Sequence, residues 1–203
     1  HMVGIGGIGM SALAQYLVHA GHEVSGEDRD ASPTTELLES RGVTVMIGEG
    51  SRGDAELVIY SDAIPTTHQA RVSAAAGGVP QLSYFEALGS VSKKARTIAV
   101  AGTHGKTTTT GMLAKILQSA GKEPTAIVGS IVRDFESNFL PGSPDLFVVE
   151  ACEYRDHLLK LSPQILVITN IELDHTDYFP NLEALQATFR KAAEKVPANG
   201  CIV

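Results

Sequence analysis

A glycine-rich loop that leads into a helix constrains this chain more than any other feature. Residues 97–101 read TIAVA, a short apolar run typical of a buried strand, and residues 102–110 read GTHGKTTTT. A strand, a glycine loop and a Gly-Lys-Thr that opens a helix are the parts of a phosphate-binding P-loop. Val100 stands where the longer form of the motif has its first glycine, so this loop is a shortened one. The pattern predicts an α/β fold with a phosphate site at this turn.

The residue types in the loop suit the binding of a nucleotide. Backbone N–H groups along residues 102–107 can surround phosphate oxygens, the Lys106 ammonium can pair with them, and the Thr107 hydroxyl can reach Mg²⁺. A chance Gly-Lys-Thr at a helix start is the alternative, but a run of threonines forms a first helical turn poorly. The predicted nucleotide contacts in the loop are Gly102, Thr103, Gly105, Lys106, Thr107 and Thr108.

A second glycine loop lies near the start of the chain. Residues 4–9 read GIGGIG, which matches the GxGxxG pattern that opens a helix and lets the backbone approach a diphosphate. Asp28 follows at about the 20-residue distance where dinucleotide-binding folds place a ribose-binding acid. By itself this pattern suggests NAD or FAD, and a tight turn without a ligand is the alternative. The loop predicts a diphosphate and does not identify it.

Polar residues follow two later apolar runs, at the edge where open α/β sheets bind their ligands. Glu150 ends one run, and its carboxylate could hold Mg²⁺ or polarise a water molecule. A helix-capping role is the alternative for this residue. His175 follows the other run and could act as a metal ligand or form a hydrogen bond. Its neighbours Asp174 and Asp177 make a solvated surface turn the alternative.

Short apolar runs alternate with helical patterns along the chain, which is the signature of βαβ units on a parallel sheet. The predicted strands are 23–26, 43–47, 57–60, 97–101, 125–128, 146–150, 165–168 and 201–203, and the predicted helices are 10–20, 33–41, 67–76, 106–120, 156–161 and 182–196. Residues 90–96 are polar and basic, and we take them as a domain boundary. The predicted fold class is α/β, with a Rossmann-like parallel-sheet domain (1–95) followed by a P-loop domain (96–203).

Charge and composition exclude several classes of protein. The chain has 203 residues, with 16 Lys+Arg and 23 Asp+Glu, so its formal charge is −7. An acidic chain without basic clusters argues against nucleic-acid binding, and no apolar run approaches the roughly 20 residues that a membrane span requires. Two cysteines without a CxxC pair argue against a disulfide framework or a zinc site. No secretory signal is visible, so we expect a cytoplasmic location.

The other histidines and cysteines carry no predicted role. We expect His19, His22 and His68 to be exposed, and Cys152 to be a small buried hydrophobe rather than a nucleophile. The chain begins and ends inside apolar runs, so we expect it to be a fragment of a longer protein. Its first two residues belong to the first strand or to a cloning remnant.

Several segments carry a resemblance to a known family. They are residues 4–11 (GIGGIGMS), 25–28 (SGED), 60–64 (YSDAI), 99–110 (AVAGTHGKTTTT) and 169–175 (TNIELDH). They occur in the order found in Mur ligases and extend over nearly the whole chain, and GTHGKTTTT is highly specific. The chain therefore resembles this family, and is most similar to the members that join L-alanine to UDP-N-acetylmuramate. The members that recycle a murein tripeptide are less similar, because their first loop departs from GIGGIGMS.

The resemblance implies an architecture and a reaction. Mur ligases have a Rossmann-like domain for the UDP-sugar, a central ATPase domain and a third domain for the incoming amino acid, and this chain resembles the first and most of the second. The reaction implied is ATP-dependent amide formation, in which the lactyl carboxylate of UDP-N-acetylmuramate becomes an acyl phosphate that L-alanine attacks. Phosphorylation gives a poor acyl donor a leaving group. ATP and Mg²⁺ are the implied cofactors, and a monomer or weak homodimer is expected.

The resemblance also assigns roles to individual residues. Lys106, Glu150 and His175 are the expected catalytic residues, with Lys106 neutralising the transferred γ-phosphate. Thr107 holds one Mg²⁺, and Glu150 and His175 hold the second. Asn170 orients the nucleotide phosphates. The residues expected at the UDP-sugar are Gly6, Ile8, Gly9, Ser11, Asp28 and Ser61.

Two segments depart from the family pattern, and two other functions stay open. Residues 150–156 read EACEYRD where the family usually has EADESD, and residues 84–86 read YFE where it has RAE. These departures bear on the substrate contacts, and the second removes a cation near the sugar nucleotide. A nicotinamide-dependent oxidoreductase would explain the first loop but not the P-loop. A non-catalytic nucleotide-binding module is the third possibility.

Overall fold

The computed structural model describes residues 1–48, 50 and 54–203. Contacts divide the chain into two compact units, residues 1–87 and 88–203, and each unit is described by itself. The boundary that the sequence places between residues 95 and 96 stays a prediction. Among the described residues, no helix is long and apolar enough to cross a membrane.

The first unit is built on a five-stranded sheet whose strands are all parallel. Its elements are β1 (Met2–Val3), α1 (Ile8–His19), β2 (Ser25–Asp28), α2 (Pro33–Ser40), β3 (Thr44–Ile47), β4 (Val58–Tyr60), α3 (Gln69–Ala76) and β5 (Gln81–Ser83), followed by the start of α4 (Tyr84–Ser92). The strand order is β3-β2-β1-β4-β5, so the direction of winding reverses at β1. This parallel sheet with its reversal at β1 confirms the predicted Rossmann-like fold. Ligands of open α/β sheets bind at such a reversal.

Local sequence explains why the helices of this unit begin where they do. The Ser32 hydroxyl accepts a hydrogen bond from the Thr35 N–H, the Thr35 hydroxyl accepts one from the Ser32 N–H, and Pro33 occupies the first turn of α2. This reciprocal cap satisfies donors that a helix start leaves unpaired. In α1 the residues Met10–Gln15 are all buried, so this helix packs its small and apolar side chains into the core.

The second unit contains a six-stranded sheet with the order β11-β10-β6-β9-β7-β8. Its elements after α4 are β6 (Arg96–Ala101), α5 (Lys106–Ser119), β7 (Pro124–Val132), the 3₁₀ helix η1 (Arg133–Phe135), β8 (Ser137–Leu140), β9 (Ser143–Glu150), the 3₁₀ helix η2 (Tyr154–Lys160), β10 (Ile165–Ile168), α6 (Leu182–Glu194) and β11 (Cys201–Ile202). Its strands are parallel except for the β7–β8 pair. The α/β class is therefore confirmed in both units.

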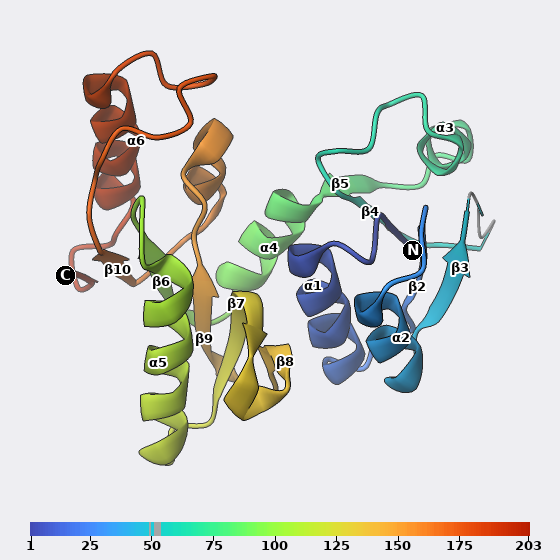
Figure 1. Ribbon diagram of the computed structural model, residues 1–203, viewed down its shortest axis with the longest axis horizontal. Coiled ribbons are helices and arrows are strands. Elements are labelled where there is room, and N and C mark those ends of the chain that lie inside the picture. Colours follow the sequence, from blue (N-terminus) through green and yellow to red (C-terminus); the bar gives the residue numbers. More distant parts are fainter. Residues whose placement is uncertain (49, 51–53) are drawn as a thin grey trace. The chain divides into compact units, whose positions relative to one another are not determined.

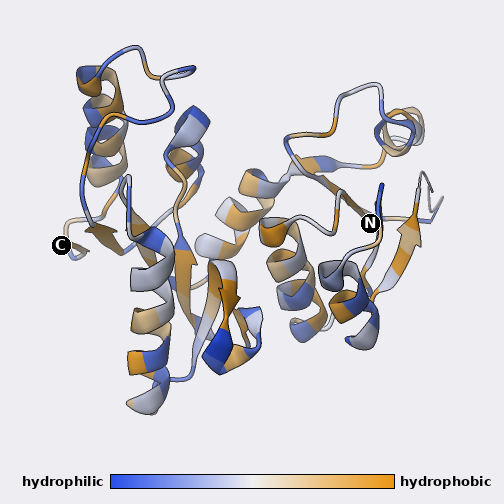
Figure 2. Ribbon diagram, viewed as in Figure 1, coloured by the Kyte–Doolittle hydropathy of each residue, from blue (hydrophilic) through white to orange (hydrophobic). Residues whose placement is uncertain are grey.

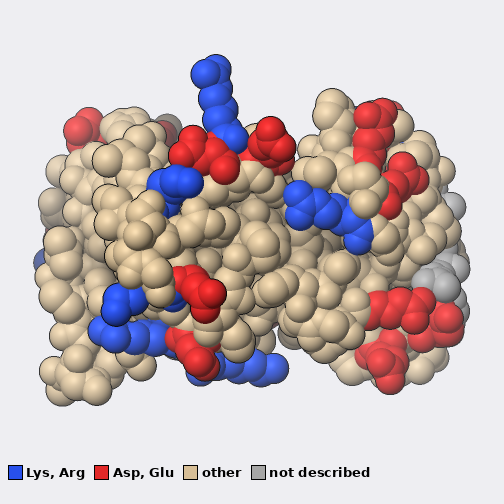
Figure 3. All heavy atoms as spheres, turned by 90° about the horizontal axis from the view of Figure 1, so that it is seen from below, with Lys and Arg blue, Asp and Glu red and all other residues tan. Residues whose placement is uncertain are grey.

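The core of the second unit lies between α5 and the sheet. Ile98, Ala114, Ala126, Leu140 and Val148 form one buried cluster that joins this helix to four strands. Figure 2 shows β9 and β10 as strongly hydrophobic strands, as expected for a parallel sheet that is covered by helices. Figure 3 shows both acidic and basic side chains on the face that it presents, with several acidic side chains gathered at its right-hand edge.

The structure corrects several predicted elements. The strand expected at 23–26 is β2 at Ser25–Asp28, because its register pairs it residue by residue with Thr44–Ile47. β5, α4 and β8 were not predicted from the sequence, and the strand expected at 125–128 continues to Val132 and pairs antiparallel with β8. The helix expected at 156–161 is instead part of the 3₁₀ element η2, whose residues Arg155 and Asp156 have φ of 51° and 60°.

A cluster of lysines gives the second unit a testable pH response. Burial, followed by the positive charges of Lys93 and Lys160, lowers the pKa of Lys195. A lowered lysine pKa means that the folded unit disfavours the charged amine, so this cost is present at neutral pH and disappears as pH rises through the lysine range. We expect Lys160→Gln to raise the pKa of Lys195 only partway to its usual value, because burial remains. NMR titration of the labelled lysine side chain measures this, and an unchanged pKa would contradict the charge contribution.

Candidate functional site

The P-loop has the predicted strand-loop-helix form. β6 ends at Ala101, and α5 begins at Lys106 after a helix cap at Gly105, whose φ of +81° favours glycine. Gly102 has a φ of +128°, and a Cβ built on it would lie 2.1 Å from the Thr169 Oγ1. Only glycine therefore allows the loop to approach the segment that follows β10 this closely.

That segment holds the loop through hydrogen bonds. The Thr103 N–H donates to the Asn170 carbonyl (3.0 Å), and the Thr103 hydroxyl donates to the Glu172 carbonyl (2.9 Å). The His104 N–H donates to the Asn170 Oδ1 (2.9 Å), and the Thr169 hydroxyl donates to the His104 carbonyl (2.6 Å). Asn170, predicted to orient a nucleotide, thus contacts the P-loop directly.

Lys106 folds back over the loop rather than extending into solvent. Its Nζ donates to the Gly102 carbonyl (2.5 Å), to the Thr103 carbonyl (3.0 Å) and to the Glu153 Oε1 (3.0 Å). An ammonium group has three N–H donors, so the protein accepts hydrogen bonds from all of them. The Lys106 side chain is 16% exposed, and that of Glu153 is 1% exposed.

Glu150 lies at the end of β9 next to the start of α5. Its carboxylate accepts hydrogen bonds from the Thr107 hydroxyl (3.0 Å) and from the Gly129 N–H (2.8 Å). Neither of these donors is a backbone N–H in the first turn of a helix, so these two hydrogen bonds do not support the helix-capping alternative for Glu150. Thr107 and Glu150, both predicted to bind Mg²⁺, are neighbours, and hydroxyl and carboxylate oxygens are the ligands that this ion prefers. These two residues therefore fit a magnesium ion.

His175 lies beside Glu153 in the structure. Its Nε2 is 3.8 Å from the Glu153 Oε1, and its ring is tilted against that of Tyr154 with the centroids 4.7 Å apart. The side chain is 37% exposed, so the solvated-turn alternative is only partly right. Within the described residues no group of three or more His, Cys, Asp or Glu side chains is arranged to hold a metal. His175 and Glu150 were predicted to share one ion, but among the described contacts none joins these two residues.

Two hydroxyl–carboxylate pairs join η2 to the loop that carries His175. The Tyr154 hydroxyl donates to Asp177 (2.6 Å), and the Tyr178 hydroxyl donates to Asp156 (2.9 Å). The first hydrogen bond lowers the pKa of Asp177, and the second raises the pKa of Tyr178. We call this set of four residues the cross-brace. The cross-brace joins segments that lie about 20 residues apart in the chain. No local sequence pattern could have indicated these contacts.

Glu153 lies at the centre of this site, between Lys106 and His175, and had no role predicted from the sequence. The only signal available was an acidic residue shortly after a strand end, inside a segment noted as a departure from the family pattern. Cys152, expected to be buried, is half-buried. Burial raises the pKa of its thiol, so the prediction that it is not a nucleophile is consistent with its environment.

The first glycine loop runs from β1 into α1. The Gly6 N–H donates to the Asp28 Oδ2 (2.8 Å), so the predicted ribose-binding acid is bonded to the loop. A Cβ on Gly9 would lie 2.7 Å from the Tyr84 ring, so Gly9 makes room for that side chain. Ser11 is fully buried in α1 and its hydroxyl donates to the Ile8 carbonyl (3.0 Å).

A pocket of about 600 Å³ opens at the carboxyl ends of β1, β2 and β4. It is lined by Val3, Gly4, Gly6, Gly7, Glu27, Asp28, Arg29, Asp30, Ser32, Gly48, Ser61, Ala63, Ile64 and His68. Three predicted substrate contacts, Gly6, Asp28 and Ser61, therefore lie together, whereas Ile8, Gly9 and Ser11 are not among the lining residues.

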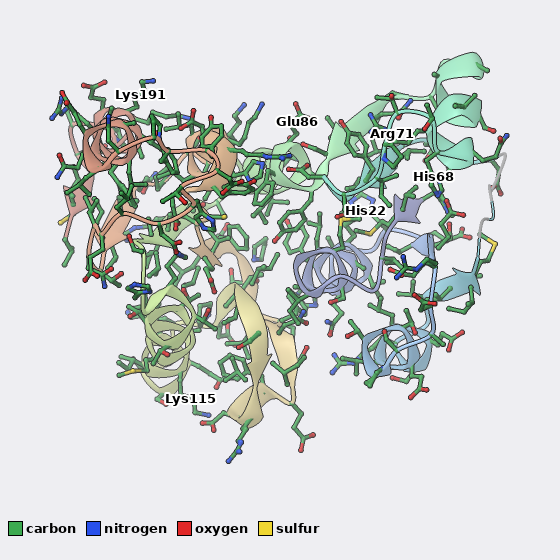
Figure 4. All side chains as sticks on the ribbon, turned by 45° about the horizontal axis from the view of Figure 1, so that its top comes forward. His22, His68, Arg71, Glu86, Lys115 and Lys191 are labelled. Atoms are coloured by element: carbon green, nitrogen blue, oxygen red, sulfur yellow. The ribbon has the colours of Figure 1, made fainter. Side chains whose placement is uncertain are left out.

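Buried polar groups form one wall of this pocket. The carboxylate of Glu27 is 2% exposed, accepts a hydrogen bond from the Gly50 N–H, and lies 3.7 Å from the His68 Nδ1. The expectation that His68 is exposed was wrong, since its side chain is 17% exposed. Arg71 stacks over the Tyr60 ring (3.6 Å to the centroid) and donates to the Ile64 carbonyl (2.8 Å), which holds the lining loop (Figure 4).

Comparisons with known proteins agree with this arrangement. The chain matches the catalytic domain of the Mur ligase family over residues 1–96 and the Mur ligase middle domain over residues 100–203. It is 46% identical to UDP-N-acetylmuramate–L-alanine ligases of Rubrobacter xylanophilus and Caldicellulosiruptor saccharolyticus, with all of this chain covered and 46% and 45% of theirs. The chain thus spans about half the length of the curated relatives it matches.

Two solved structures are also similar. The UDP-N-acetylmuramate–alanine ligase of Thermotoga maritima matches with a TM-score of 0.90 and 31% identity over 99% of this chain and 47% of that one. The UDP-N-acetylmuramate:L-alanyl-γ-D-glutamyl-meso-diaminopimelate ligase of Neisseria meningitidis matches with a TM-score of 0.88 and 31% identity, over all of this chain and 69% of that one. Both units, both glycine loops and these likenesses lead to one conclusion: the chain belongs to the Mur ligase family.

Proposed function

We propose that this chain supplies the UDP-sugar and ATP sites of an enzyme that joins L-alanine to UDP-N-acetylmuramate, in the synthesis of peptidoglycan precursors. The observation that carries the proposal is the convergence of Lys106, Thr107 and Glu150 at one end of the second sheet. The likeness to L-alanine ligases over the whole chain supports the choice of substrates. ATP and the sugar nucleotide are cytoplasmic metabolites, so we propose the cytoplasm as its location.

In this proposal the P-loop binds the phosphates of ATP. Backbone N–H groups of a glycine loop at a helix start attract anions through their partial positive charges, without an ionised side chain. Lys106 would exchange its loop carbonyls for the γ-phosphate and neutralise the charge that moves to the substrate carboxylate. The proposed nucleotide contacts are Gly102, Thr103, Gly105, Lys106, Thr107, Thr108 and Asn170.

Magnesium fits the oxygen donors at the start of α5. Thr107 and Glu150 would hold one side of its coordination sphere, since their oxygens already lie 3.0 Å apart. When bound, the ion would neutralise phosphate charge and align the transferred group. We propose His175 as a ligand of a second ion. The cross-brace holds the loop that carries His175, so it sets the position of this side chain.

The pocket of the first unit would bind the UDP-sugar. Ser61 offers a hydroxyl to a diphosphate, and the Gly6 N–H, which donates to Asp28 in the structure, would have to exchange that carboxylate for a phosphate oxygen. The pocket also contains the acids Glu27, Asp28 and Asp30, which repel phosphate but accept hydrogen bonds from hydroxyl groups. We therefore propose that these acids face the ribose or the sugar. Ile8, Gly9 and Ser11 would act from the start of α1, by shaping the loop.

A substrate screen tests the proposal. The gene product that contains this sequence is mixed with ATP, Mg²⁺ and UDP-N-acetylmuramate, and phosphate release is followed with L-Ala, L-Ser, Gly or L-Ala-γ-D-Glu-meso-diaminopimelate as the amine. We expect release to depend on the sugar nucleotide and to be fastest with L-Ala. Release without any dependence on UDP-N-acetylmuramate would contradict the proposed reaction.

A tripeptide ligase is the second candidate function. It is favoured by the similarity to the Neisseria meningitidis protein, whose name specifies that activity. The same screen separates the two candidates, because faster phosphate release with the tripeptide than with L-Ala would replace the first proposal by the second.

A further inference from the structure

Glu153 is a buried carboxylate at the N-terminal cap of η2, between two residues of the proposed active site. Each of its oxygens lies 3.0 Å from the Lys106 Nζ, and Oε1 is also 3.8 Å from the His175 Nε2. Its side chain is 1% exposed, and the contact of Oε2 with the Lys106 Nζ is an ion pair without hydrogen-bond geometry. A carboxylate removed from water in this way is costly unless a cation stays beside it. Lys106 is that cation.

The pairing constrains what Lys106 can do. Its ammonium donates to two loop carbonyls and to Glu153, and Glu153 is the one charged acceptor among the three. A phosphate that binds to Lys106 must therefore displace at least one of these acceptors. Displacement of the carboxylate exchanges one anion for another, so Glu153 competes directly with a phosphate for the same ammonium group.

The backbone around Glu153 is held in an unusual conformation. Arg155 and Asp156, which follow it, and His175, which lies beside it, all have φ between 51° and 60°, a region that non-glycine residues rarely adopt. Such strain persists only where surrounding contacts impose it. The cross-brace supplies those contacts, and Asp156 also accepts a hydrogen bond from the Thr188 hydroxyl of α6.

We infer that Glu153 is a positioning residue that holds Lys106 retracted on the P-loop and links it to His175, and that a nucleotide must displace this carboxylate to bind Lys106. The inference rests on the proposed function, because it concerns the nucleotide of that same site. It predicts that the chain binds ATP more weakly than its P-loop alone would allow. It also predicts that removal of the carboxylate strengthens ATP binding but slows turnover.

The first measurement is the affinity for ATP in the presence of EDTA, by isothermal titration calorimetry on the 203-residue chain. We expect Glu153→Gln to bind ATP about ten-fold more tightly than wild type, because a neutral amide competes for Lys106 more weakly than a carboxylate and does not repel phosphate. Glu153→Asp keeps the charge but shortens the reach, so its affinity should lie between the two. If the glutamine variant does not fold, the aspartate variant carries the test alone.

Glu172→Gln is the matched control. It removes a carboxylate from the segment that binds the P-loop, but this side chain is 69% exposed and its carboxylate lies 4.0 Å from the His104 Nε2. Exposed pairs contribute little, so its affinity for ATP should stay within about two-fold of wild type.

The second measurement is turnover in the ligation assay. We expect Glu153→Gln to lower kcat by about ten-fold or more without raising the KM for ATP, since Lys106 and His175 lose their shared anchor. A merely structural role would lower the fraction of active protein and leave both the KM and the EDTA affinity unchanged.

The outcomes separate this inference from the proposed function. If wild type binds no ATP with or without Mg²⁺, the proposed function fails. If wild type binds ATP through Lys106 but both Glu153 variants bind it with wild-type or weaker affinity, the proposed function stands and the inference about Glu153 is overturned.

Discussion

Replacement of Gly102 by alanine is expected to destabilise the second unit by about 3 kcal/mol and to abolish ATP binding. The new Cβ would lie 2.1 Å from the Thr169 Oγ1 and 3.0 Å from the Asn170 carbonyl oxygen, so the loop and the segment after β10 must separate. Overpacking costs about 1–3 kcal/mol, and a φ of +128° adds backbone strain of about 1–3 kcal/mol. Urea denaturation and calorimetric titration with ATP measure the two effects.

Gly105→Ala is the matched control for this prediction. Gly105 also has a positive φ (+81°), but nothing lies within 4 Å of a Cβ built there. Only the cost of the left-handed conformation applies, about 1–2 kcal/mol. If the two variants lose the same stability, the close approach of Gly102 to Thr169 is not what the glycine is needed for.

Replacement of Lys106 by alanine is expected to reduce ligation at least about 10³-fold in kcat/KM, because positioned cations contribute this much to phosphoryl transfer. Binding of UDP to the pocket of the first unit should be unchanged, since none of the residues lining that pocket belongs to the P-loop. Phosphate release and a calorimetric UDP titration are the measurements. Retained ligation would contradict the proposed role of Lys106.

The same substitution should also destabilise the second unit, for a reason unrelated to catalysis. It leaves the Glu153 carboxylate buried without its ammonium partner, and a broken buried pair typically costs about 3–5 kcal/mol. The double variant Lys106→Ala/Glu153→Gln removes the uncompensated charge, so it should recover part of this stability while ligation stays lost. Recovery of ligation in the double variant would show that the single variant fails through misfolding.

The parts of the candidate site that could be located from the sequence are those that depend on near neighbours. The P-loop prediction needed only a strand, two glycines and a lysine within ten residues, and the structure has β6, the loop and α5 in those places. Glu150 was identified because it directly follows an apolar run. Both inferences use the rule that ligands bind at the carboxyl ends of parallel strands, which needs no knowledge of pairing.

The parts that the sequence did not predict depend on contacts between distant segments. Glu153 meets Lys106 across 47 residues, and the cross-brace joins residues 154–156 to residues 177–178. The hydrogen bond from the Gly6 N–H to the Asp28 carboxylate also joins segments that lie 22 residues apart. The antiparallel β7–β8 pair was missed because its hairpin contains an irregular register and a 3₁₀ turn.

The sequence by itself determined the α/β class, the two glycine loops and the family, because glycine conformation, hydrophobic periodicity and short motifs are local properties of the chain. Tertiary structure alone decided which charges meet. It placed Glu153 rather than Glu150 against Lys106 and His175, and it set this carboxylate in a site where water is excluded. The physical reason is that burial and distance, not residue type, set how strongly a charge acts, and both arise only when segments far apart in the chain pack together.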